Sequence, residues 1–285
     1  MIQIFSAFGS KLHHIYDFAS HCFLERGAEL KQARRLTKFC MHAPSLFPQS
    51  TREDIGSDDF EPFIAHTLGI YYSSIGHHDA IQTLTMSGHS LDSFILLRTQ
   101  LEAILAFFYI TEPQDDLLEI FTRTERYRDW IAVKMKQNMD KSLKFDVLQK
   151  LMSGDFKNNV LGNYNAILEK YATTPQELNK LENANSFLSR NERETLAIKF
   201  NIEGFYHHIY AESSAGIHFA DISDRMQEVE FYTYRYKIRK QHDAFWPLML
   251  SNMLQVKCIL QFGKFFGIES YITPLVRDIM GYKDK

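Results

Sequence analysis

The amino-acid sequence predicts an all-α protein, a single multi-helix bundle around one buried central helix. Apolar residues recur at three- and four-residue spacings along most of the 285-residue chain, and hydrophobic residues make up 45% of it. Gly and Pro number only 13 and 7, and no Ser/Gly-rich linker separates the halves. Apart from two charges, residues 94–108 are apolar around nearly the whole helical circumference, as in a helix inside a bundle. We therefore expect one helical domain, residues 1–285.

The first part of the chain predicts amphipathic helices followed by an exposed loop. Residues 2–41 carry apolar positions at helical spacing and are expected to form one or two helices. Pro44 and Pro48 end this pattern, because proline disfavours helical geometry in the residue before it. The polar stretch that follows makes residues 43–60 the best candidate for an exposed loop.

The next segment predicts helices that lead into the central one. A helix begins near Asp59 with Pro62 in its first turn, where the missing N–H of proline costs little. Residues 76–79, Gly-His-His-Asp, predict a break and a new N-cap. The central helix then spans Ser87 to Tyr109, and the Thr-Glu-Pro sequence at 111–113 ends it.

Residues 115–138 predict a charged amphipathic helix that begins with acidic residues, which the helix dipole favours. Its expected buried stripe is Leu118, Phe121, Tyr127, Trp130, Ile131 and Met135. The helical pattern weakens near Ser153, and a short capped helix follows Thr174. The section from Leu178 to Arg193 is polar and is expected at the periphery.

The C-terminal part predicts two further helices and one ambiguous segment. A helix around Phe205 to Tyr210 runs into small residues at 213–216, which allow close backbone approach. Aromatic and charged residues alternate near 229–238, a pattern that fits a short extended piece as well as a helix. Residues 242–266 predict a strongly apolar helix with a proline close to its start.

Composition and charge indicate a soluble, cytoplasmic protein without a metal or cofactor. The formal net charge is -3, so the surface as a whole does not attract polyanions. The cysteines form no C-x-x-C pair, and the first residues show no secretory signal. The His-His doublets cannot readily hold one ion, because adjacent helical residues diverge by about 100°. The chain has neither a Walker motif nor a G-x-G-x-x-G loop.

Two charges that interrupt the central helix give the main functional clue. Arg98 and Glu102 lie one helical turn apart, and ionised side chains are rarely buried without partners. In one interpretation they form a structural ion pair that fixes the register of the bundle. In the other, Arg98 grips a phosphate or carboxylate and Glu102 orients it. Arg before Glu is the less favourable helical orientation, which leaves room for other partners.

His218, beyond Ser213 and Ser214 in the small-residue segment, is the second clue. A histidine with an ordinary pKa exchanges a proton at neutral pH, so His218 is a candidate catalytic residue with Ser213 as its partner. The alternative is a structural histidine in the core or on the surface.

Basic residues interleaved with tyrosines form a third candidate. Arg235 and Lys237 could contact an RNA backbone while the tyrosines stack on unpaired bases. The more common explanation is a solvated face whose basic side chains cover a neighbouring helix.

Two short motifs resemble an uncharacterised bacterial family of helical proteins. They are L-x-R-x-x-x-E, here Leu96 to Glu102, and Y-x-x-S-x-x-x-x-H, here Tyr210 to His218. The resemblance implies that residues 127 and 128 belong to the same constellation. The candidate ligand-binding residues are Tyr127, Arg128, Tyr210, Ser214, Arg235 and Lys237.

A more distant similarity is to the HEPN helical ribonucleases of toxin and antiviral defence systems, whose signature is an Arg followed at short distance by a His. Ser213 stands in the place of that Arg before His218, so Arg98 or another cation would have to supply the charge. The similarity implies a metal-independent ribonuclease in which His218 is the general acid or base and Arg98 stabilises the phosphorane. It also implies an RNA substrate and a homodimer. The alternative is a non-catalytic binding or assembly module with a protein partner, in which Arg98, Glu102, Tyr210 and His218 form a structural network.

Overall fold

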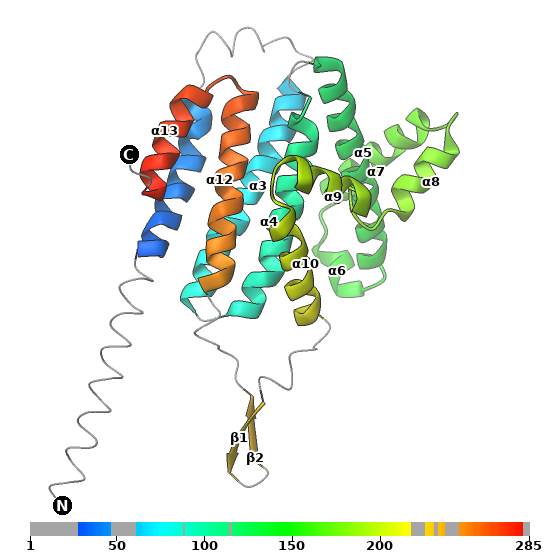
Figure 1. Cartoon of the computed structure of the whole chain (residues 1–285). Coiled ribbons are helices and arrows are strands. Elements are labelled where there is room, and N and C mark those ends of the chain that lie inside the picture. The colour runs from blue at the N-terminus through cyan, green and yellow to red at the C-terminus, as the bar shows by residue number, and fades with distance from the viewer. Residues whose placement is uncertain are drawn as a thin grey trace, which may run out of the picture.

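The computed structural model describes residues 28–46, 61–87, 89–113, 116–217, 226–230, 233–236 and 245–281. These residues form helices and one small hairpin, which confirms the all-α bundle (Figure 1). After a helix at 28–42, the elements are η1 (Ala43–Leu46), α3 (Glu61–Met86), α4 (Ser90–Thr111), α5 (Leu117–Ser142), α6 (Asp146–Leu151), α7 (Gly154–Lys170), α8 (Pro175–Asn183), α9 (Arg190–Lys199), α10 (Glu203–Ile217), β1 (Met226–Glu230), β2 (Thr233–Tyr236), α12 (Phe245–Phe265) and α13 (Glu269–Met280).

The bundle is built around α4, as the sequence predicts. Helices α3, α10 and α12 lie against it, and α13 packs on α12 (Figure 1). The wholly buried apolar side chains of α4 are Leu97, Leu101, Ile104, Leu105, Phe107, Phe108 and Ile110. Burial of one such side chain stabilises the fold by roughly 1.5–3 kcal/mol, so α4 anchors the core. The segment Asp92–Thr111 is long and apolar enough to cross a membrane, but most of it is buried, as in the core helix of a soluble protein.

A chain of neutral polar side chains, here called the core network, crosses the bundle between α3, α4 and α12. Nδ1 of His78 lies 2.7 Å from the Ser251 hydroxyl, which donates to Oε1 of Gln100 at 2.6 Å. Gln100 in turn donates through Nε2 to Oε1 of Gln255 at 3.2 Å. All four side chains are buried. Burial lowers the pKa of His78 to about 4, so its imidazole is neutral at pH 7.

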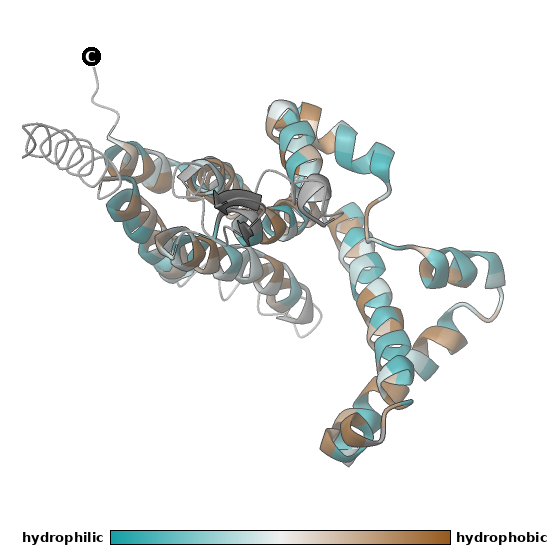
Figure 2. Ribbon diagram, turned by 90° about the horizontal axis from the view of Figure 1, so that it is seen from below, coloured by the Kyte–Doolittle hydropathy of each residue, from teal (hydrophilic) through white to brown (hydrophobic). Residues whose placement is uncertain are grey.

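Helices α7 and α8 pack on α5, to one side of the bundle. Arg123 fixes the start of α5, because Nη1 donates to the Tyr109 carbonyl of α4 at 2.7 Å and to Glu112 at 2.9 Å. The Nε of Arg123 donates to Glu119 at 2.7 Å. With 26 residues α5 is about 39 Å long, and α7 and α8 pack along it. Seen from below, these helices extend away from the bundle (Figure 2).

The predicted break at residues 76–79 is wrong, because α3 runs without interruption from Glu61 to Met86. His78, in the middle of the predicted break, is wholly buried and belongs to the core network. Packing of this face against the bundle outweighs the weak helix propensity of Gly76, which is exposed. The chain leaves the helix only after Met86.

The predicted buried stripe of α5 is wrong at half of its positions. Leu118 is 76% exposed, and Phe121 and Met135 are exposed as well, whereas the other three residues are partly buried. The prediction assumed that apolar positions along the whole helix face one core. At the start of α5 the buried side chains are instead Ile120 and Thr124, and Leu118, two positions before Ile120, faces nearly the opposite direction.

The section from Leu178 to Arg193 is not peripheral throughout, contrary to the prediction. Phe187 and Leu188 are buried and belong to the hydrophobic core. The Phe187 ring packs edge-on against the Tyr127 ring of α5, with 5.0 Å between the ring centroids. This section therefore connects α5 to the bundle.

Three predicted segments are described in part. Of the predicted loop at 43–60, the first four residues form η1 with Ala43 buried, and residues 47–60 lie outside the described residues. Residues 2–27 of the predicted first helices lie outside them too. The ambiguous segment near 229–238 falls on the antiparallel hairpin of β1 and β2, whose register places Met226 opposite Tyr236.

Candidate functional site

Four side chains from three helices converge on one face of α4. They are Arg98 and Glu102 of α4, Arg193 of α9 and Tyr210 of α10, and we call them the arginine cluster. Oε1 of Glu102 lies 3.3 Å from Nε of Arg98 and 3.8 Å from Nη1 of Arg193. The Tyr210 hydroxyl donates to the same oxygen at 2.9 Å. Glu102 is thus the common partner of two cations and a phenol.

Local sequence explains why these groups meet. The four-residue spacing of Arg98 and Glu102 places them on the same face of α4. Helix α9 begins with a capping box, in which Ser189 and Glu192 each bond the backbone N–H of the other, so that Arg193 falls on the first turn. The buried face of α9 then holds this turn against α4.

Both guanidinium groups stack on the Tyr210 ring, at 4.6 Å from its centroid for Arg98 and 5.3 Å for Arg193. Burial and the nearby Glu102 carboxylate raise the pKa of Tyr210, so its hydroxyl stays protonated and donates to Glu102. With one carboxylate for two guanidinium groups, the arginine cluster carries one excess positive charge. About a third of the Arg98 and Glu102 side chains is exposed to solvent.

A cavity of about 220 Å³ adjoins the arginine cluster, and we call it the cluster cavity. Glu102 and Arg193 line it together with the aromatic rings of Tyr127, Trp130 and Phe187. Nε1 of Trp130 and Nε of Arg193 are buried and have no hydrogen-bond partner among the described residues. An unpaired buried donor is costly, so a ligand that brings acceptor atoms would be favoured here.

The structure brings together four of the residues singled out from the sequence. Arg98, Glu102 and Tyr210 share direct contacts, and Tyr127 lines the adjoining cavity. Ser213 is buried and donates to the Tyr210 carbonyl at 3.3 Å, within its own helix.

The remaining predicted residues are not part of this site as described. Arg128 lies on another side of α5 and lines a different cavity. His218 and Lys237 lie outside the described residues, as do the side chains of Ser214 and Arg235. The predicted meeting of Arg98 and His218 therefore stays a prediction.

Three residues of the site escaped the sequence analysis, Arg193, Phe187 and Trp130. Arg193 and Phe187 belong to the section predicted as peripheral, and Trp130 was assigned only to a buried stripe. The Ser-x-x-Glu sequence at 189–192 was the available signal for Arg193, because it predicts a helix start just before this residue. No short sequence pattern marks Trp130 as the wall of a cavity.

Within the described part of the chain, no group of three or more His, Cys, Asp or Glu side chains is arranged to hold a metal ion. The arginine cluster itself offers donors and a single carboxylate. Its chemistry suits an anion that accepts hydrogen bonds, and phosphate and carboxylate groups match the planar fork of a guanidinium.

Comparison with known proteins gives a family without an assigned activity. The sequence model of DUF5677, a family of unknown function, matches residues 65–231, more than half of the chain. This range contains all four residues of the arginine cluster. No curated protein and no solved structure shows significant similarity to the chain. The expectation of an uncharacterised family is confirmed, and the similarity to HEPN ribonucleases stays a prediction.

Proposed function

Since the chain belongs to DUF5677, a family of unknown function, we propose its function from the site: it binds single-stranded RNA through a phosphate at the arginine cluster. The reaction that fits this binding is metal-independent cleavage of the RNA, as the similarity to HEPN ribonucleases implies. The corresponding biological role is that of a cytoplasmic effector in toxin or antiviral defence.

The excess of cations in the arginine cluster carries this proposal. Arg98 and Arg193 share the single carboxylate of Glu102, so one guanidinium charge is left for a ligand. A phosphodiester brings one negative charge and paired oxygens, which a guanidinium binds through two parallel hydrogen bonds. Glu102 and the Tyr210 ring hold the two guanidinium groups in place before the ligand arrives.

The cluster cavity supports the choice of RNA with unpaired bases. Its lining combines aromatic rings with donor groups, and proteins bind single-stranded RNA by stacking bases on aromatic rings while cations hold the backbone. At about 220 Å³ the cavity is smaller than the roughly 300–1,000 Å³ of drug-sized pockets, so it suits one small unit such as a base.

Cleavage of the RNA would require the imidazole of His218 at this site as well. As general base it would take the proton of the RNA 2′-hydroxyl, whose oxygen then attacks the adjacent phosphorus. The bond to the 5′-oxygen breaks, that oxygen is protonated, and the products are a 2′,3′-cyclic phosphate and a free 5′-hydroxyl. Arg98 would stabilise the added negative charge of the phosphorane, without a metal.

Binding of a fluorescent single-stranded RNA tests the proposal. Arg98→Gln and Arg193→Gln should each weaken binding at least tenfold, because each removes a charged hydrogen bond of about 1.5–3 kcal/mol. Arg190→Gln is the matched control, since Arg190 is a highly exposed arginine of the same α9. Equal affinities for all three variants contradict the proposal. His218→Ala should keep the binding and lose cleavage, with His207→Ala on the exposed face of α10 as its control.

A second candidate, the non-catalytic module with a structural network, is favoured by the partners that Glu102 has within the protein. Its Oε1 already faces two guanidinium groups and a phenol within the protein. Glu102→Gln separates the two candidates, because it raises the positive charge of the arginine cluster. In an RNA-binding site the variant binds RNA at least as tightly as the wild type. In a purely structural network it lowers stability and no RNA binding is measured for either protein.

A further inference from the structure

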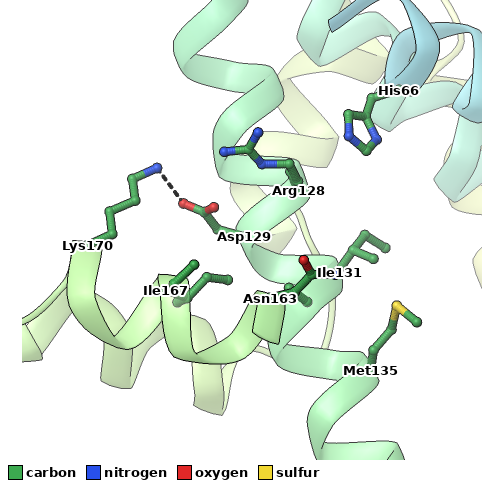
Figure 3. A pocket seen from close by; sticks show the side chains of 10 residues that line it. His66, Arg128, Asp129, Ile131, Met135, Asn163, Ile167 and Lys170 are labelled. Carbon is green, nitrogen blue, oxygen red and sulfur yellow. Dashed lines mark hydrogen bonds and ion pairs between the residues drawn. The ribbon is translucent and has the colours of Figure 1, made fainter. Parts of the chain in front are cut away.

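A second and larger cavity, of about 500 Å³, lies between α3, α5 and α7 (Figure 3). We call it the α5–α7 cavity. It is separate from the cluster cavity, because Arg128 and Ile131 of α5 line it, whereas Tyr127 and Trp130 line the other. Neighbouring positions on a helix point about 100° apart, so the two cavities lie on different sides of α5.

The α5–α7 cavity has an apolar wall. Ile131 and Met135 of α5 and Ile167 of α7 line it (Figure 3). Its volume falls within the roughly 300–1,000 Å³ typical of small-molecule pockets, which are also mostly apolar with a few placed polar groups. The wall therefore suits the apolar body of a small ligand.

One edge of the α5–α7 cavity is a fixed ion pair. Nζ of Lys170 lies 2.7 Å from Oδ2 of Asp129 (Figure 3), and the Tyr171 hydroxyl donates to the same oxygen at 2.9 Å. The Asp129 side chain is only 3% exposed. A carboxylate so buried requires these partners, which hold Lys170 at the edge of the cavity.

Three further polar groups that line the cavity have unused hydrogen-bonding capacity. Arg128 donates through Nη2 to Glu125 at 3.2 Å, and its other guanidinium N–H groups have no partner among the described residues. The side chains of His66 and Asn163 likewise make no hydrogen bond within the described part of the chain. Burial and the neighbouring Arg128 lower the pKa of His66, so its imidazole is neutral at pH 7 and offers one N–H.

We infer that the α5–α7 cavity binds a small monocarboxylate with an apolar body. The charged groups that line it are Arg128, Lys170 and Asp129, and Glu125 pairs with both cations, at 3.2 Å from Arg128 and 3.3 Å from Lys170. The free guanidinium N–H groups of Arg128 match the two oxygens of a carboxylate. A phosphate monoester, with nearly two negative charges, would meet the Asp129 carboxylate with its excess charge.

Calorimetric titration of the full chain with three probes tests this inference. Octanoate has both the charge and the apolar body, acetate has only the charge, and 1-octanol has only the body. Octanoate should bind at least tenfold more tightly than either of the others. Equal binding of acetate overturns the apolar part of the inference, and equal binding of 1-octanol overturns the carboxylate part.

Two variants test whether octanoate binds in the α5–α7 cavity. Arg128→Gln removes the guanidinium and Ala166→Trp fills the cavity from a position that is exposed on α7, and each should weaken octanoate binding at least tenfold. Arg190→Gln, far from this cavity, is the control, and a thermal melt followed by circular dichroism verifies folding. Unchanged octanoate binding in both variants overturns the inference. Displacement of octanoate by a short single-stranded RNA overturns it as well, because it assigns the cavity to RNA.

Discussion

The core network and the arginine cluster both tie α4 to its neighbours, but they do so with different chemistry. Gln100, in the core network, is wholly buried and meets hydroxyl and amide groups. Arg98 and Glu102, two residues away on either side, are about one third exposed and form an ion pair. Positions two apart on a helix face nearly opposite directions, so α4 presents one polar set to the core and another to the boundary with solvent.

The comparison shows how the distance from water selects the polar groups of a bundle. A charge that loses its hydration is far more costly than a neutral group that exchanges water for a hydrogen bond. The core network accordingly contains amides, a hydroxyl and an imidazole whose pKa burial lowers to about 4. The arginine cluster keeps its charges because solvent still reaches them, and charges that solvent reaches are also available to a ligand.

The largest expected effect is the loss of stability that acid causes through the core network. In the unfolded chain the His78 imidazole has an ordinary pKa of about 6.5, so below this pH the unfolded state binds more protons than the folded one. The free energy of unfolding therefore falls as the pH drops from 6.5 to 4, by about 3 kcal/mol in all, and is unaffected by this group above 6.5. Urea unfolding of the wild type and His78→Gln between pH 8 and 4 measures the effect.

The difference in stability between these two proteins should be constant above pH 6.5 and should shrink below it. His66 and His77, whose pKa values are also lowered, remain in both proteins, so their contributions cancel. Parallel stability profiles down to pH 4 would show that burial does not hold His78 neutral.

Loss of an amide should be the next largest effect. Gln100→Leu removes the acceptor of the Ser251 hydroxyl and the donor to Gln255, at about constant volume. Leaving buried polar groups unpaired costs roughly 1–3 kcal/mol each, and we expect a loss of about 2 kcal/mol in urea unfolding. Thr99→Leu, on the exposed side of the same helix, is the control. A loss no greater than that of the control would mean that the core network contributes no stability.

The smallest effect should come from the arginine cluster. Tyr210→Phe removes one hydrogen bond to Glu102 but keeps the ring on which the guanidinium groups stack. Because the group is only partly buried, we expect a loss of at most about 1 kcal/mol, or about 2–4 °C in melting temperature. A loss of stability as large as that of Gln100→Leu would indicate that the arginine cluster is part of the structural core, and it would count against a ligand site there.

The sequence alone predicted the central helix, its end at residues 111–113 and the contact of Arg98 with Glu102. These features depend on local spacing and on residue types that end helices, and both can be recognised within one or two helical turns. The position of Tyr210 beside Glu102 was anticipated only through the family resemblance, since the two residues are far apart in the chain.

The failures of the prediction arise from tertiary packing. Gly76 resembles a helix break, but α3 continues because this part of the helix packs into the bundle, where His78 is buried and bonds to Ser251 of α12. Leu118 was expected in the core, but Ile120 faces the bundle at this turn of α5 and Leu118 faces solvent. Both cavities are formed by helices distant in sequence, and hydrophobic periodicity gives no information on how such helices meet.

The directional bonds of the core network also define how far along their axes the helices sit. If α12 slid by one helical turn past α4, about 5.4 Å, apolar side chains would still meet apolar side chains. Ser251 and Gln255 are one turn apart on α12, so one of them would take the place of the other beside Gln100, and the second position would hold the apolar Pro247 or Ile259. Gln100 would then lose one of its two hydrogen bonds. Apolar contacts alone tolerate such sliding, whereas the complete set of hydrogen bonds forms in only one longitudinal alignment of α12 and α4.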